Sequence, residues 1–184
     1  LNECASDTAY GRECYKTQLE LIKSLDVTRP RSFSSCRFKT DICFDLVDVV
    51  SYNIYPKWYH NTPVAMYLDD LYKWVQTTGG AGKPFLITEV GAGAIYGYRT
   101  PAKVKWSEEY QVLALEEQLG AILSYKDCSG VYIWQFCDVR VTNDWWNTRP
   151  RTMNNKGIVD EYRRPKLSYE TVKRIFGSVD TYRK

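Results

Sequence analysis

Apolar and polar residues alternate along this chain in two patterns, one typical of amphipathic helices and one typical of buried strands. Apolar residues recur every three or four positions in residues 11–25, 62–78, 107–122 and 166–176, which predicts four helices. Nearly continuous apolar runs, rich in β-branched and aromatic residues, predict strands over residues 31–35, 46–55, 84–88 and 130–137. Because strands and helices follow one another in turn, the pattern predicts an α/β fold with a parallel sheet covered on both faces.

Local signals place some of the helix ends and one buried face. Thr62 is expected to cap the second helix, with Pro63 at its first position. Ser107 is expected to cap the third helix, and a long loop is expected over residues 138–160. The expected buried face of the first helix comprises Tyr15, Leu19 and Ile22.

Composition narrows the class of protein. The chain has 184 residues, 44% of them hydrophobic and 26% charged, which suits one globular domain with a sizeable core. The net charge of +3 is spread along the chain, and the basic stretch at residues 163–166 is short and lacks an aromatic ladder. We therefore expect no nucleic-acid binding. No run of about 18 apolar residues occurs, so no membrane-spanning helix is expected.

Cysteine and histidine usage gives little support for a metal site. The six cysteines form no Cys-x-x-Cys pair, and His60 is the only histidine. Free buried thiols are favoured over disulfides in a domain of this length. No glycine-rich phosphate loop follows a strand, which removes the usual nucleotide-binding signals. The compartment stays open, with the cytoplasm slightly favoured and secretion compatible with the sequence.

Two glutamates stand where apolar strands end. Glu89 follows the strand at residues 84–88, and Glu3 stands at the start of the chain. A carboxylate at such a place is costly unless it is solvated or paired, and two carboxylates on strands of one sheet suit glycoside hydrolysis. The aromatic content of 15% also suits stacking on sugar rings. Gly91 and Gly93 are expected to leave room for a sugar close to the backbone. The alternative for Glu89 is a rim carboxylate paired with a lysine or arginine, and the alternative for Glu3 is a frayed terminal glutamate.

Five strings carry a resemblance to a known family. They are Asn2-Glu3 and residues 48–59 (Asp-Val-Val-Ser-Tyr-Asn-Ile-Tyr-Pro-Lys-Trp-Tyr), 87–92 (Ile-Thr-Glu-Val-Gly-Ala), 106–111 (Trp-Ser-Glu-Glu-Tyr-Gln) and 154–158 (Asn-Asn-Lys-Gly-Ile). Together and in this order they resemble the catalytic barrel of family 2 glycoside hydrolases, and within that family the β-glucuronidases.

The resemblance implies a (β/α)8 TIM barrel, in which this chain covers roughly the end of strand 4 through helix 8. Residues 1–184 would then be the C-terminal part of the catalytic domain. The first half of the barrel and the preceding β-sandwich domains would lie in a longer polypeptide, which is expected to form a homo-oligomer. Cys4 departs from the family pattern, in which proline often follows the first glutamate.

The resemblance also implies roles for the two glutamates and their neighbours. Glu89 corresponds to the nucleophile, and Glu3 corresponds to the general acid/base. Asn2 corresponds to the asparagine that contacts the sugar 2-hydroxyl. Asn53 and Tyr55 match the family's Asn-x-Tyr, whose tyrosine lies near the nucleophile.

Further positions match the sugar pocket of the β-glucuronidases. Tyr59 and Trp134 match its aromatic positions, with core packing as the alternative for each. Asn154 and Lys156 match the Asn-x-Lys pattern that binds the substrate carboxylate, although Asn-Lys-Gly is also common in turns. Arg149 and Arg151 are further cations on the same loop, and either of them could assist Lys156.

The implied activity is retaining hydrolysis of β-D-glucuronides through a covalent glycosyl-enzyme intermediate, without a cofactor. A β-galactosidase or β-mannosidase of the same family is an alternative. A catalytically inactive half-barrel that binds carbohydrate or a partner is another, since half a barrel exposes sheet edges. A nucleotide-binding α/β domain is disfavoured, because no phosphate loop is present.

Overall fold

The computed structural model describes residues 1–142 and 148–179, which form two compact units. Unit 1 comprises Leu1–Ile54, Thr62–Glu89 and Ile122–Tyr132. Unit 2 comprises Tyr55–Asn61, Val90–Ala121 and the chain from Ile133 onward.

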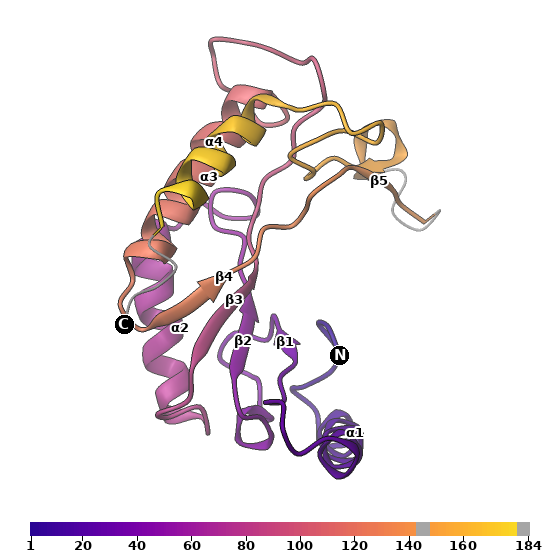
Figure 1. The fold of residues 1–184 in the computed structure, drawn as a ribbon, viewed down its shortest axis with the longest axis vertical. Coiled ribbons are helices and arrows are strands. Elements are labelled where there is room, and N and C mark those ends of the chain that lie inside the picture. The colour runs from indigo at the N-terminus through magenta and orange to yellow at the C-terminus, as the bar shows by residue number, and fades with distance from the viewer. Residues whose placement is uncertain (143–147, 180–184) are drawn as a thin grey trace. The chain divides into compact units, whose positions relative to one another are not determined.

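Unit 1 is built on a parallel four-stranded sheet with the strand order β1-β2-β3-β4. Figure 1 shows these four strands side by side. Neighbouring strands pair in parallel throughout, as the alternation of strands and helices predicted. The strands are β1 (Ser34–Ser35), β2 (Val50–Asn53), β3 (Phe85–Glu89) and β4 (Cys128–Val131).

The start of the chain extends this sheet beyond β1. Asn2 forms a parallel bridge with Ser34. The amide of Glu3 donates to the Ser34 carbonyl at 2.9 Å, and the Ser34 amide donates to the Leu1 carbonyl at 3.2 Å. Residues 1–3 therefore lie where the end of a further parallel strand was expected.

Helix α1 (Ala9–Leu25) begins at the N-cap Thr8, whose hydroxyl accepts a hydrogen bond from the Gly11 amide. Tyr15 and Leu19 are buried as predicted, but Ile22 is 48% exposed. The buried row runs at intervals of four residues through Gly11, Tyr15 and Leu19. Ile22 shares this helical face but lies nearer the helix end at Leu25, where no further residue continues the buried row.

Helix α2 (Val64–Thr77) begins one residue later than expected. Pro63, at ψ 135°, is the N-cap, and its carbonyl accepts from the Tyr67 amide at 3.0 Å. The predicted cap at Thr62 is therefore wrong, because Pro63 is extended rather than helical. The predicted apolar stripe is confirmed, since Val64, Leu68, Leu71 and Val75 are all at most 1% exposed.

Aromatic rings fill the core of unit 1. Tyr15 packs on Phe33 with 4.5 Å between ring centroids, and Phe33 lies 6.1 Å from Phe44. Trp74 on α2 then packs in T-shaped geometry against Phe44 and against Tyr52 of β2, with 5.6 Å and 6.5 Å between the ring centroids. This row joins α1, the 3₁₀ turn η1 (Phe44–Leu46) and α2 to the sheet.

Strand β2 is shorter than the predicted strand at residues 46–55. The segment before it forms η1, and Arg31 fixes the next residues. The backbone carbonyl of Arg31 accepts from the amides of Asp48 and Val49, while its guanidinium pairs with the Asp48 carboxylate. These contacts hold residues 48–49 at the start of β2 instead of inside a longer strand.

Unit 2 contains α3 (Glu108–Ser124) up to Ala121, α4 (Leu167–Gly177) and an antiparallel pair of β5 (Val139–Arg140) and β6 (Met153–Asn154). A 3₁₀ turn, η3 (Pro150–Thr152), precedes β6. The predicted cap of α3 is confirmed, because the Ser107 hydroxyl accepts from the Tyr110 amide at 3.2 Å.

The predicted strand at residues 130–137 is wrong beyond Val131, where β4 ends. Residues 135–138 form hydrogen bonds with residues 156–159 instead. The Gln135 amide donates to the Lys156 carbonyl at 3.1 Å, and the Val159 amide donates to the Phe136 carbonyl at 3.0 Å. A segment more than 20 residues further along the chain has therefore replaced the sheet as the hydrogen-bond partner, which a local apolar pattern does not reveal.

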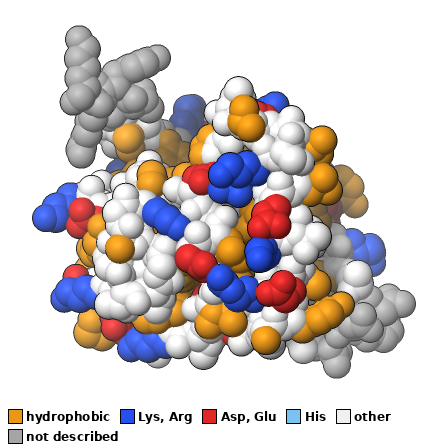
Figure 2. Space-filling model, turned by 90° about the horizontal axis from the view of Figure 1, so that it is seen from below, with side chains coloured by type: hydrophobic (Ala, Val, Ile, Leu, Met, Phe, Trp, Pro, Cys, Tyr) orange, Lys and Arg blue, Asp and Glu red, His pale blue; other side chains and the backbone are white. Residues whose placement is uncertain are grey.

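Several whole-chain expectations can be compared with the described residues. The six cysteines are free thiols, and only Cys43 is buried, whereas buried thiols had been favoured. Within residues 1–142 and 148–179, no helix has the length and apolar character needed to cross a membrane. Lysine, arginine and acidic side chains intermingle on the face drawn in Figure 2, in keeping with a net charge spread along the chain.

Truncation of the α2 stripe should weaken the fold. Leu71 is fully buried, so Leu71→Ala should lower the free energy of unfolding by about 2–5 kcal/mol. Met66→Ala is the matched control on the same helix, because Met66 is 59% exposed and its truncation should change stability by less than about 0.5 kcal/mol. Urea unfolding of the full-length protein measures both, and equal effects of the two variants would contradict the assigned stripe.

Candidate active site

The candidate glutamates of unit 1 lie at the carboxyl ends of strands in one parallel arrangement. Glu89 ends β3 and stands in register with Asn53, the last residue of β2. The Ile54 amide donates to the Glu89 carbonyl at 2.9 Å, which continues the pairing to this edge. Asn2 and Glu3 follow the same edge beside β1. The sheet thereby brings Asn2, Glu3, Asn53 and Glu89 to one edge, as the sequence predicted.

Asn53 links the ends of three strands. Its side-chain amide nitrogen donates to Asn2 Oδ1 and to Glu3 Oε1, each at 3.0 Å. Its amide oxygen accepts from the Thr88 hydroxyl at 2.7 Å, one residue before Glu89. Asn53 is 4% exposed, and its three bonds together hold its side chain in one orientation.

Cys36, which follows β1, is a residue of this edge that the sequence did not single out. Partial burial raises the pKa of its thiol, the charges of Glu3 and Glu89 raise it further, and the Arg37 guanidinium opposes them. Both glutamate charges therefore act on the same exposed side chain. Its position directly after a predicted strand was the only signal in the sequence that could have identified it.

In unit 2, Lys156 lies among aromatic rings. Its ammonium nitrogen is 5.1 Å from the ring centroid of Tyr55, 5.6 Å from that of Trp58 and 5.1 Å from that of Tyr59. The Lys156 residue is only 3% exposed. Such a cage favours a cation through the negative faces of the rings and removes much of its water. The sequence predicted Tyr55, Tyr59 and Lys156 as site residues, and unit 2 brings them together.

The Tyr59 hydroxyl accepts hydrogen bonds from two cations. Lys156 Nζ donates to it at 3.0 Å, and an Arg149 guanidinium nitrogen donates at 3.3 Å. Desolvation by itself raises the pKa of Tyr59, but the two positive charges outweigh it, so the pKa lies below its ordinary value. Arg151 instead pairs with Glu161, so Arg149 is the arginine beside Lys156.

Asn154 and Trp134 also lie in unit 2, but neither is part of the lysine cage in the contacts described. Asn154 Oδ1 accepts from the Lys156 amide at 3.3 Å, which is the turn contact that the alternative interpretation of Asn-Lys-Gly anticipated. Trp134 is 37% exposed, and its amide donates to the Val90 carbonyl at 2.8 Å. The place of its ring in a sugar pocket stays a prediction.

Gly91 and Gly93 lie directly against other protein groups. The expectation that they leave room for a sugar is therefore wrong. A Cβ on Gly91 would lie 2.2 Å from the Trp134 carbonyl oxygen. A Cβ on Gly93 would lie 2.8 Å from the Trp106 ring and 2.9 Å from the Trp58 ring. Both glycines are therefore needed for close packing beside the lysine cage.

Comparison with protein families and curated proteins gives consistent matches. The family model "Glycosyl hydrolases family 2, TIM barrel domain" matches residues 2–181. The β-glucuronidase of Rattus norvegicus is 33% identical over 179 residues, which cover 91% of this chain and 26% of that protein. The β-glucuronidase of Homo sapiens is 31% identical over 177 residues, with 90% and 26% covered.

Solved structures of similar proteins match over nearly the whole chain. A family 2 β-galacturonidase from Eisenbergiella tayi, bound to galacturonate, has a TM-score of 0.96 and 73% sequence identity, covering 97% of this chain and 32% of that one. A β-D-glucuronidase from Dictyoglomus thermophilum has a TM-score of 0.86 and 26% identity, covering 100% and 32%. The chain thus spans about a quarter to a third of the length of these relatives. On this match over residues 2–181, the chain belongs to family 2 of the glycosyl hydrolases and adopts the fold of that family's TIM barrel domain.

Proposed function

We propose that the protein carrying this chain hydrolyses β-linked hexuronides with retention of configuration, and that galacturonides are its preferred substrates. The observation that carries the hydrolytic chemistry is the hydrogen-bond chain from Glu3 through Asn53 to Thr88, which ends beside Glu89. It provides two carboxylates at one sheet edge, the minimum that glycoside hydrolysis requires.

In this proposal Glu89 attacks the anomeric carbon while Glu3 gives its proton to the departing oxygen. Water, deprotonated by Glu3, then breaks the glycosyl–Glu89 ester and releases the sugar. The amide of Asn53 donates to Glu3 Oε1, so the transferable proton belongs on Oε2. Because an N–H group can donate to a carboxylic acid carbonyl or to a carboxylate, Asn53 can orient Glu3 in both steps.

Lys156 is proposed to bind the carboxylate at C6 of the sugar. Its ammonium group is almost fully buried among rings, where a charge-assisted hydrogen bond to a carboxylate is stronger than in water. The Tyr59 hydroxyl, held by Lys156 and Arg149, offers a further polar contact for the same group. A neutral sugar lacks the carboxylate and gains nothing from this cluster.

The similarity to a β-galacturonidase supports galacturonides as the preferred substrates. Identity is 73% to that enzyme, compared with 33% and 31% to the two mammalian β-glucuronidases. Glucuronides are the second candidate, supported by those curated relatives and by the resemblance in sequence. The two sugars differ only in configuration at C4, so the same lysine can serve either carboxylate.

The roles of the two glutamates can be separated by substitution in the full-length protein. Glu89→Gln should lower kcat by about 10⁴-fold or more, because the nucleophile is lost. Glu3→Gln should lower kcat by about 10²–10⁴-fold for substrates with poor leaving groups. With an activated aryl glycoside, whose departure needs no acid, added azide should replace water in the second step and restore turnover while forming a β-glycosyl azide. Glu13→Gln on the exposed face of α1 is the control. Turnover of Glu89→Gln within tenfold of the parent would overturn the assignment.

Lys156→Gln should selectively impair uronide hydrolysis. Loss of one charge-assisted hydrogen bond of about 1.5–3 kcal/mol corresponds to a rise in KM of about 10–100-fold. The kcat/KM for p-nitrophenyl β-D-galactoside, which has no carboxylate, should stay within twofold. Lys173→Gln on the surface of α4 controls for the change in net charge. An equal decrease in kcat/KM for the uronide and the neutral galactoside would show that Lys156 does not bind the carboxylate.

Steady-state assays with p-nitrophenyl β-D-galacturonide and β-D-glucuronide test the preferred sugar. We expect kcat/KM to be at least about tenfold higher for the galacturonide, with the β-anomer released first as followed by proton NMR. A preference for the glucuronide would select the second candidate. Initial release of the α-anomer would contradict the double-displacement scheme.

A further inference from the structure

We propose that the buried ion pair between Asp138 and Lys166 positions Lys156 for its contact with the substrate carboxylate. The proposal rests on the function proposed above for Lys156. Asp138 and Lys166 contact neither the cage nor, in this scheme, the sugar, and they act through the backbone on each side of Lys156.

Lys166 is saturated with hydrogen-bond acceptors. Its ammonium group has three donors, and the structure gives them three partners: Asp138 Oδ1 at 2.8 Å, the Ala94 carbonyl at 2.6 Å and the Asn155 carbonyl at 3.1 Å. Both charged side chains of the pair are 0% exposed. The ammonium group therefore fixes the carbonyl of the residue directly before Lys156.

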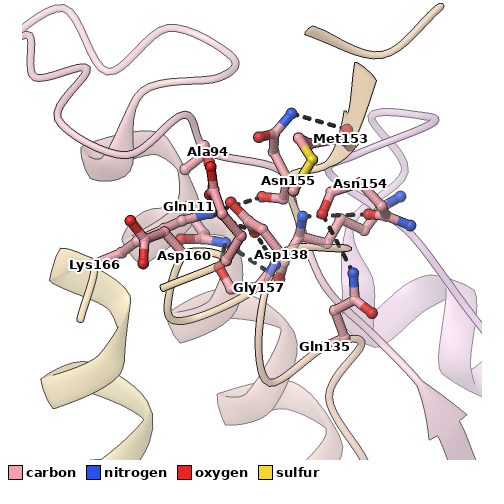
Figure 3. Close-up of polar contacts among 12 residues, drawn as sticks. Ala94, Gln111, Gln135, Asp138, Met153, Asn154, Asn155, Gly157, Asp160 and Lys166 are labelled. Carbon is pink, nitrogen blue, oxygen red and sulfur yellow. Dashed lines mark hydrogen bonds and ion pairs between the residues drawn. The ribbon is translucent and has the colours of Figure 1, made fainter. Parts of the chain in front are cut away.

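Asp138 fixes the residue directly after Lys156. Its Oδ1 accepts from the Gly157 amide at 2.8 Å as well as from Lys166. Figure 3 shows Asp138 and Lys166 converging on the Asn155–Gly157 segment. The peptide units on both sides of Lys156 are thus tied to one buried charge pair.

Gln111 on α3 completes the hold on this segment. Its amide nitrogen donates to the Gly157 carbonyl at 3.0 Å and to the Ala92 carbonyl at 2.8 Å. The Ser168 hydroxyl donates to the amide oxygen of Gln111 at 2.7 Å and so fixes its orientation. The backbone around Lys156 is held from α3, from the start of α4 and from residue 138.

A requirement for precise placement explains why such a costly pair lies here. Replacement of a buried ion pair by apolar side chains is often neutral or stabilising, so the pair is weak support for stability alone. Burial raises the pKa of Asp138 to about 6 despite the Lys166 charge, and Asp138 Oδ2 has no hydrogen-bond partner among the described residues. The directional bonds to the Asn155 carbonyl and the Gly157 amide are what an apolar replacement would lack.

A long lysine side chain needs an anchored backbone to hold its ammonium in the ring cage. Four flexible methylene groups separate the Lys156 backbone from its ammonium group, so a shift of the backbone would move Lys156 Nζ away from Tyr59. Loss of the pair should therefore impair recognition of the carboxylate before it impairs the chemistry at the glutamates.

The double variant Asp138→Leu with Lys166→Met tests the proposal without leaving an unpaired buried charge. In the full-length protein, KM for p-nitrophenyl β-D-galacturonide should rise about tenfold, while its kcat and the kcat/KM for the neutral galactoside stay within twofold. The control is Asp41→Asn in unit 1, a buried carboxylate that accepts from Ser35 and from the Cys43 amide, and it should leave the ratio of uronide to neutral-sugar kcat/KM unchanged. A folded double variant with an unchanged ratio overturns the proposal.

A second variant and a second measurement cover failure of the double variant to fold. The crystal structure of the full-length Lys166→Met protein, in which the Asn155 carbonyl loses the ammonium donor, should show the Asn155–Gly157 segment displaced and the 3.0 Å contact between Lys156 Nζ and the Tyr59 hydroxyl lost. If this contact persists, the positioning role is wrong. Lys156→Gln, assayed in parallel, separates the two hypotheses, because an unchanged sugar ratio there refutes carboxylate recognition whatever the crystal structure shows.

Discussion

The hydrogen-bond register of the parallel sheet in unit 1 is the constraint on which the candidate chemistry depends. Parallel pairing carries the carboxyl ends of successive strands to one edge, so residues far apart in sequence meet there. Asn2 pairs beside Ser34, and Asn53 stands opposite Glu89. A slip of one residue in either pairing would turn the side chains to the other face and separate the carboxylates from Asn53.

In each unit, the candidate residues are held by a buried polar group that takes several partners at once. In unit 1 the Asn53 amide binds Asn2, Glu3 and Thr88. In unit 2 the Lys166 ammonium group binds Asp138 and two backbone carbonyls. Directional bonds to a buried side chain fix orientation more strictly than apolar packing does, which suits the precise placement that the proposed function requires.

The sugar itself is a question that the site residues answer only in part. A cation in an aromatic cage favours a carboxylate, and glucuronides and galacturonides both carry one. The resemblance of the motifs led to glucuronides, while 73% identity to a β-galacturonidase favours galacturonides. In the proposed function, the lysine cage selects uronides as a class, and other contacts distinguish the configuration at C4.

The sequence by itself determined the alternating strands and helices, the α2 stripe, the two strand-end glutamates and the lysine of the Asn-x-Lys string, because these follow from local periodicity and short motifs. Only the tertiary structure decided that Arg149 rather than Arg151 joins Tyr59, and that Gly91 faces the Trp134 carbonyl. It also decided that residues 135–138 leave the sheet to pair with residues 156–159. Each of these outcomes depends on a partner distant in sequence, and a local pattern of apolar and polar residues carries no information about which distant groups will compete for the same hydrogen bonds or the same space.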